Sequence, residues 1–136
     1  MTRFLLDTHI FVWTKTAERP VLPHVLSQMA DPANEVLVSL ASAWELCIKA
    51  AVGKLTGDAS LLVGEEASFE RALETSGLQL LPILPTHIFA VRNLPMYHRD
   101  PFDRLIVAQA ITEGMTLITA DRRLDAYEGL DMIVGA

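Results

Sequence analysis

Short apolar runs alternate along the chain with longer stretches in which apolar residues recur every three to four positions. Five of the short runs have the length and the Val, Ile and Leu content of buried strands, and they cover residues 4–6, 36–38, 78–81, 116–119 and 132–134. Three longer stretches have the periodicity of helices, at residues 41–52, 65–75 and 102–112. Each of the three ends at or just before a glycine, which commonly terminates a helix.

Strands separated by helices require crossover connections, which produce a mostly parallel sheet with helices on both faces. We therefore expect an α/β fold, a three-layer α/β/α sandwich. No internal repeat or low-complexity tract divides the chain, and a length of 136 residues is that of one domain. We expect residues 1–136 to form a single domain. In the helix at 41–52, Trp44, Ile48, Ala51 and Val52 lie on one face, and we expect Trp44 to be a core or dimer contact rather than a platform for stacking a base.

Four acidic residues stand where this fold would place its ligand crevice. Asp7 follows the first strand, Glu45 lies early in the helix after the second, Asp103 begins the helix at 102–112, and Asp121 follows the fourth strand. Strand carboxyl ends and the following helix starts share one edge of a parallel sheet. Because clustered carboxylates repel one another unless a cation lies among them, and hard oxygen ligands suit Mg²⁺ or Mn²⁺ better than zinc, we expect a metal site there.

Helix capping is the alternative explanation for each acid taken singly. The segment Ser42-Ala43-Trp44-Glu45 has the capping-box pattern, and Glu45 and Lys49 are spaced to form an ion pair. Asp100 before Pro101 is an ordinary helix start, and Asp121 would cap a short following helix. Asp7 is less well explained by capping, because an unpaired carboxylate at the end of an apolar strand is costly to bury.

Composition narrows the class of protein. With 11 Lys and Arg against 17 Asp and Glu, the net charge of −6 excludes a basic protein that coats nucleic acid by bulk charge. It leaves room for an acidic site that reaches a phosphate through a metal ion. The single cysteine, Cys47, cannot form an internal disulfide. No signal peptide or long apolar segment is present, so we expect a cytoplasmic protein without membrane association.

The same acids lie within longer motifs that resemble those of one family. Leu5-Leu6-Asp7-Thr8-His9 and Ser42-Ala43-Trp44-Glu45-Leu46, which continues to Gly53-Lys54-Leu55, look like the first two motifs of PIN-domain proteins. His98-Arg99-Asp100-Pro101-Phe102-Asp103-Arg104-Leu105 and Leu117-Ile118-Thr119-Ala120-Asp121 resemble the third and fourth. The order and the spacing match across most of the chain. The resemblance is closest to the VapC-type toxin ribonucleases of bacterial toxin–antitoxin pairs.

This resemblance implies a compact parallel sheet flanked by helices and a metal-dependent endoribonuclease that hydrolyses RNA phosphodiester bonds. Carried over residue by residue, the catalytic and metal-binding acids are Asp7, Glu45, Asp103 and Asp121. They would hold one or two Mg²⁺ or Mn²⁺ ions, with Glu45 as a ligand or as the acceptor that orients a bound water. The family also implies a homodimer and a small antitoxin protein whose tail enters the active-site groove.

Further residues take supporting roles in this interpretation. Asp100 would act as a helix cap or an outer partner of the metal site, and Thr8 and Thr119 would orient the carboxylates. Lys49 and Arg104 are the candidates to hold RNA phosphates beside the site.

Other functions remain to be weighed against the toxin. A stand-alone PIN nuclease would have the same site without an antitoxin, and a non-enzymatic PIN module would bind RNA or a protein partner. A haloacid-dehalogenase-like phosphatase also has an Asp after its first strand. That family needs a second Asp two residues further on, where this chain has His9. A nuclease and phosphatase assay with divalent metal would separate these functions.

Overall fold

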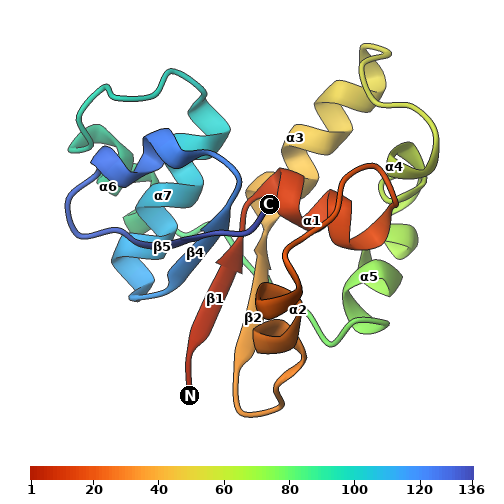
Figure 1. Ribbon diagram of the computed structural model, residues 1–136. Helices are drawn as coiled ribbons and strands as arrows, with labels where there is room; N and C mark the ends of the chain where they lie inside the picture. The colour runs from red at the N-terminus through yellow and green to blue at the C-terminus, as the bar shows by residue number, and fades with distance from the viewer.

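The centre of the molecule is a five-stranded, entirely parallel sheet. The computed structural model describes residues 1–136, and the strands are arranged in the order β3-β2-β1-β4-β5. Their bounds are β1 Arg3–Leu6, β2 Glu35–Ser39, β3 Gln79–Leu81, β4 Thr116–Thr119 and β5 Asp131–Val134. All five predicted strands are confirmed. The first and the last strand belong to the same sheet, as Figure 1 shows.

Helices cover both faces of this sheet. They are α1 Thr8–Lys15, α2 Pro23–Ala30, α3 Leu40–Ala51, α4 Asp58–Leu61, α5 Glu66–Glu74, α6 Pro85–Arg92 and α7 Pro101–Glu113, with a 3-10 helix η1 at Arg122–Ala126. Figure 1 shows α1, α2 and α5 on one side of the sheet and α6 and α7 on the other. The predicted α/β sandwich is therefore confirmed, and the predicted helices at 41–52, 65–75 and 102–112 correspond to α3, α5 and α7.

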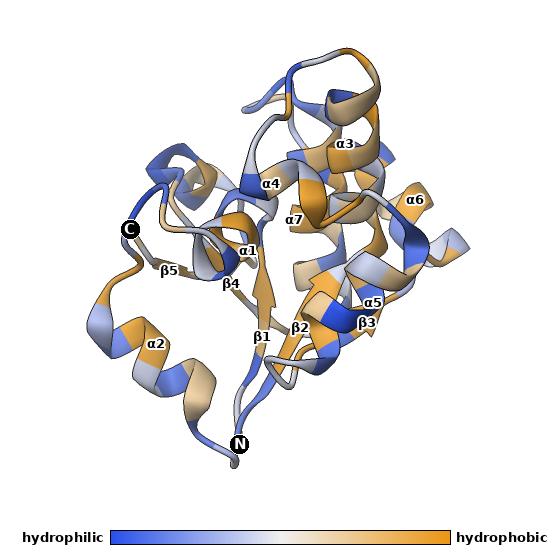
Figure 2. Cartoon of the chain, turned by 90° about the vertical axis from the view of Figure 1, so that its right-hand side faces the viewer, coloured by the Kyte–Doolittle hydropathy of each residue, from blue (hydrophilic) through white to orange (hydrophobic).

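Each face of the sheet has its own hydrophobic core, because successive strand residues point to opposite faces. Phe4 and Leu6 of β1 pack into a cluster of 15 buried residues with α1 and α5. Leu5, between them, packs into a second cluster of 12 buried residues together with α7. Strands buried on both faces appear as continuous apolar runs, and β1 and β2 are orange beyond their polar first residues in Figure 2. No helix is both long enough and apolar enough to cross a membrane.

The apolar face of α3 is largely exposed, so Trp44 is not a core residue. Trp44, Ile48 and Val52 are 56%, 41% and 61% exposed. The helix lies at the carboxyl edge of the sheet and packs against α1 and α7, and there it buries Ala41, Ser42, Glu45 and Leu46 instead. Two of these four residues are polar, so an apolar periodicity could not identify this face.

The order of the strands places the candidate residues. The chain leaves β1 to form β2 and β3 on one side, and later returns to form β4 and β5 on the other. A parallel sheet has its ligand crevice where the strand order reverses in this way, beyond the carboxyl ends of the strands. Here that point lies beyond β1 and β4, which are paired at Leu6 and Ile118.

Candidate metal centre

Asp7 lies at the bottom of the crevice, directly after β1. Its side chain is 6% exposed, and one carboxylate oxygen caps α1 by accepting a hydrogen bond from the Ile10 amide at 2.8 Å. The other oxygen accepts a hydrogen bond from the Thr119 hydroxyl. Burial raises the pKa of Asp7 above its ordinary value, and these two hydrogen bonds only partly oppose the rise. The carboxylate is thus fixed in orientation and poorly solvated.

Asp103 approaches the same crevice from the start of α7. Asp100 caps this helix by accepting a hydrogen bond from the Phe102 amide at 2.9 Å, as predicted. Burial, followed by the negative charge of Asp100, raises the pKa of Asp103 from 3.8 to about 7. The charges of Asp7 and Glu45 add to this rise. Carboxylates from three separate elements therefore act on one another, which is the crowding that the sequence predicted.

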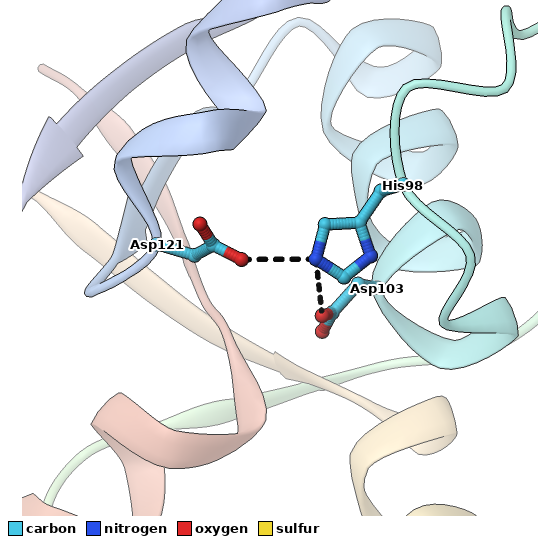
Figure 3. Close-up of side chains that lie close together, drawn as sticks. All are labelled: His98, Asp103 and Asp121. Atoms are coloured by element: carbon cyan, nitrogen blue, oxygen red, sulfur yellow. Dashed lines mark hydrogen bonds and ion pairs between the residues drawn. The ribbon is translucent and has the colours of Figure 1, made fainter.

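Asp121 completes the acidic edge of the crevice beyond β4. It caps η1 through the Arg123 amide, and the Arg123 guanidinium contacts both carboxylate oxygens at 2.9 and 2.8 Å. These bonds hold the pKa of Asp121 well below its usual range. Figure 3 shows His98 between Asp121 and Asp103, with its Nε2 atom 2.9 Å from one carboxylate and 3.6 Å from the other.

Glu45 reaches the site from α3 and is 3% exposed. Its Oε2 atom accepts a hydrogen bond from Lys49 at 2.7 Å, the predicted ion pair. Its Oε1 atom is buried and has no hydrogen-bond partner. The capping-box alternative for Glu45 is wrong, because Ser39 caps α3 instead. A buried carboxylate oxygen without a donor is costly, and a bound cation would remove that cost.

The arrangement fits a hard divalent cation. A cavity of about 370 Å³ is lined by Asp7, Asp100, Asp103 and Asp121 together with His9, His98, Ala120 and Arg123. One ligand atom each from His98, Asp103 and Asp121 lie within 4.8 Å of one another. Carboxylate oxygens dominate this set of donors, which is the preference of Mg²⁺ and Mn²⁺.

The supporting residues behave differently from one another. Thr119 orients the Asp7 carboxylate as predicted. The hydroxyl of Thr8 contacts that of Ser42 on α3 at 2.9 Å, in a buried position. The Thr8 hydroxyl therefore does not bond to a carboxylate, contrary to the prediction for it. Thr8 acts on the site only indirectly, by joining the start of α1 to the helix that carries Glu45.

The structure contradicts the predicted contact between Arg104 and an RNA phosphate. Arg104 is 8% exposed, and its guanidinium donates to the carbonyl oxygens of Pro95, Val91 and Leu94. It follows Asp103 by one position in α7, so its side chain points about 100° away around the helix. The residue anchors the end of α6 and the next loop to α7.

His98 is a site residue that sequence reasoning did not include. The Asp100 amide donates to its Nδ1 atom at 3.3 Å, so Nε2 carries the hydrogen that faces Asp121. Its position two residues before the cap of α7 was the available signal. The Arg123 guanidinium also contacts Asp121. Donors from this chain thus occupy Asp121 on the side where a cation would bind.

Comparison with known proteins agrees with this fold. The sequence matches the family described as PIN domain over residues 4–130. The chain belongs to the PIN-domain family.

Within that family it is a homologue of the VapC ribonucleases. It is 32% identical over 128 residues to Ribonuclease VapC22 of Mycobacterium tuberculosis, and the match covers 93% of both chains. The fold is similar to that of VapBC2 from Rickettsia felis bound to a promoter DNA fragment, with a TM-score of 0.73, 19% identity and coverage of 99% and 100% of the two chains. It is also similar to DNA-bound VapBC from Salmonella typhimurium, with a TM-score of 0.66, 16% identity and 98% coverage of both.

Proposed function

We propose that the chain is a divalent-metal-dependent endoribonuclease and the toxin of a VapBC-type pair. The observation that carries the proposal is the meeting of Asp7, Asp103 and Asp121 at one cavity. Glu45 lies close enough to raise the pKa of Asp103, and its Oε1 atom is buried and unpartnered. The homology to Ribonuclease VapC22 supports RNA as the substrate.

The four acids would hold one or two Mg²⁺ or Mn²⁺ ions, as the donor set favours. When bound, such an ion stabilises negative charge on a phosphate and lowers the pKa of a coordinated water. Asp7 is held rigid by Thr119 and the Ile10 amide, so its oxygens keep one orientation. Lys49 fixes one oxygen of Glu45, and the other oxygen is buried without a partner. Asp100 aligns the first turn of α7, and thereby Asp103.

A cleavage assay tests this proposal directly. The purified chain is incubated with single-stranded RNA, single-stranded DNA and a phosphatase substrate, with Mg²⁺, with Mn²⁺ or with EDTA. We expect endonucleolytic cleavage of RNA that EDTA abolishes. RNA cleavage that persists in EDTA would contradict the metal site. Loss of terminal phosphate from the phosphatase substrate would favour the phosphatase alternative, and no reaction on any substrate would favour a binding module.

An antitoxin partner distinguishes the toxin from a stand-alone nuclease. The structural neighbours are VapBC proteins. Beside α3 and α5 lies an apolar groove of about 400 Å³ that includes Leu40, Cys47 and Phe69. Its edge carries the acids Glu65, Glu66 and Glu70, which suits a basic amphipathic segment. Co-purification with the product of a small neighbouring gene would support the toxin, and the absence of such a gene would favour the stand-alone enzyme.

A homodimer is the assembly proposed for the toxin. Ile88 and Phe89 of α6 are 50% and 70% exposed, and Met96 and Tyr97 in the following loop are 72% and 56% exposed. Exposed apolar groups close together in sequence favour a protein contact. Light scattering after size exclusion should give twice the monomer mass of 15.0 kDa, and a mass equal to one chain would contradict the dimer.

A further inference from the structure

A second cavity adjoins the metal centre and has the opposite electrostatic character. It has a volume of about 400 Å³ and shares Asp100 with the acidic cavity. Its walls come from the second half of α3, the loop after it and the segment that enters α7. They include three cations, Lys49, Lys54 and Arg99. We call this cavity the basic groove.

Two of the three cations of the basic groove are available to a ligand, while Lys49 is paired with Glu45. Arg99 and Lys54 are exposed, and neither side chain forms a hydrogen bond or ion pair within the chain. The only acids that line the groove are Glu45 and Asp100, which belong to the metal centre. In a chain of net charge −6, three cations beside the acids form a local exception. An anionic group placed there would lie next to whatever phosphate the metal centre holds.

The groove also has an aromatic and apolar floor. Phe102, Ile48 and Val52 line it. Trp44 packs edge-on against Phe102, with ring centroids 4.8 Å apart, and remains 56% exposed. Trp44 thus belongs to the exposed apolar face of α3. An exposed indole beside cations is the arrangement that binds an unpaired base by stacking while the cations hold the backbone.

We infer that the basic groove binds the single-stranded RNA that flanks the scissile phosphate, with Arg99 and Lys54 on backbone phosphates and Trp44 stacked on an unpaired base. The inference rests on the proposed function and adds the path of the substrate. A base-paired strand cannot offer a free base face to Trp44, so the groove selects single strands. The path runs from the acidic cavity, across Asp100, towards the end of α3.

Salt dependence of binding tests the phosphate contacts. The probe is a fluorescein-labelled single-stranded RNA of twelve nucleotides, measured by anisotropy with Ca²⁺ in place of Mg²⁺, and a gel confirms that it stays intact. Each phosphate contact on a single strand contributes about 0.7 to the slope of log Kd against log salt. We expect Lys54→Ala/Arg99→Ala to lower the slope by about 1.4. Arg71→Ala/Arg92→Ala removes two exposed cations from α5 and α6 and should leave it unchanged. Equal slopes for both variants would overturn the inference.

Fluorescence tests the stacking contact. Trp13→Phe leaves Trp44 as the only tryptophan, because the chain contains two. Single-stranded RNA should quench its emission, and a duplex of the same sequence should not. Emission unaffected by the single strand would refute the role of Trp44.

These binding readouts are independent of catalysis. RNA binding through the groove without any metal-dependent cleavage would contradict the proposed function and would still support the inference about the basic groove. Metal-dependent cleavage together with an unchanged salt slope in Lys54→Ala/Arg99→Ala would support the proposed function and contradict the inference about the basic groove.

Discussion

Replacing Asp103 with asparagine should stabilise the metal-free protein at neutral and higher pH. The pKa of Asp103 is raised from 3.8 to about 7 by burial and by Asp100. Between these pH values the folded chain keeps a proton that the unfolded chain has released. The free energy of unfolding of the wild type therefore falls as the pH rises from about 4 to about 7.

The size of the effect follows from the shift. About three pH units at about 1.36 kcal/mol each give about 4 kcal/mol. Because the Asp103 side chain keeps 20% of its exposure, water relieves part of this penalty, and we expect a difference of about 2–4 kcal/mol. Burial of Asp7 acts in the same direction. The lowered pKa of Asp121 changes the free energy of unfolding only at pH values below about its ordinary pKa of 3.8, which is outside this pH range.

Urea unfolding followed by circular dichroism measures this effect. Wild type, Asp103→Asn and the control Asp131→Asn are compared in EDTA at pH 5 and pH 8. Asp131 is an exposed acid at the start of β5, at the opposite end of the sheet. Part of the penalty is already present at pH 5, so Asp103→Asn should gain about 1–3 kcal/mol over wild type on going from pH 5 to pH 8, and the control should gain none. An equal pH response of Asp103→Asn and wild type would refute the account of crowded carboxylates.

Three further substitutions probe the surroundings of the site. Arg104→Met should lower the free energy of unfolding by about 2–4 kcal/mol, because it leaves three carbonyl oxygens without their buried donor. The Mn²⁺ affinity measured by calorimetry should not change, and a lowered affinity would contradict the structural role assigned to Arg104. Thr119→Val removes the hydroxyl that orients Asp7 and should weaken Mn²⁺ binding about 10–100-fold; unchanged affinity would contradict its positioning role. Arg123→Ala should raise the pKa of Asp121 towards its ordinary value, since the guanidinium is the main cause of the lowering. A carboxyl titration by NMR in metal-free protein measures the change, and an unshifted pKa would refute the role assigned to Arg123.

The layered fold and the convergence of the acids were predictable because both depend on chain order. Asp7 and Asp121 follow strands that lie side by side, and in a parallel sheet strand ends must meet. Capping and metal binding were not exclusive alternatives. Asp7, Asp100 and Asp121 cap helices and still face the crevice, because a helix that starts at this edge places its cap there.

The errors concern the direction of side chains, which an apolar pattern does not encode. Arg104 is adjacent to Asp103 in sequence yet points to the carbonyl oxygens at the end of α6. Trp44 looked like a core residue by its spacing, but α3 lies at the edge of the sheet and buries its polar side. His98 escaped notice because its contact with Asp121 depends on how the loop before α7 folds back.

RNA cleavage measured against Mg²⁺ concentration, for wild type, Asp7→Asn and Asp131→Asn, tests the central claim most directly. Asp7 is the most buried of the acids that line the metal cavity. Asp131 is exposed and does not line that cavity. The account predicts cleavage that rises with Mg²⁺ for wild type and Asp131→Asn, and none for folded Asp7→Asn. Full cleavage by Asp7→Asn, or cleavage by wild type without divalent metal, would contradict it.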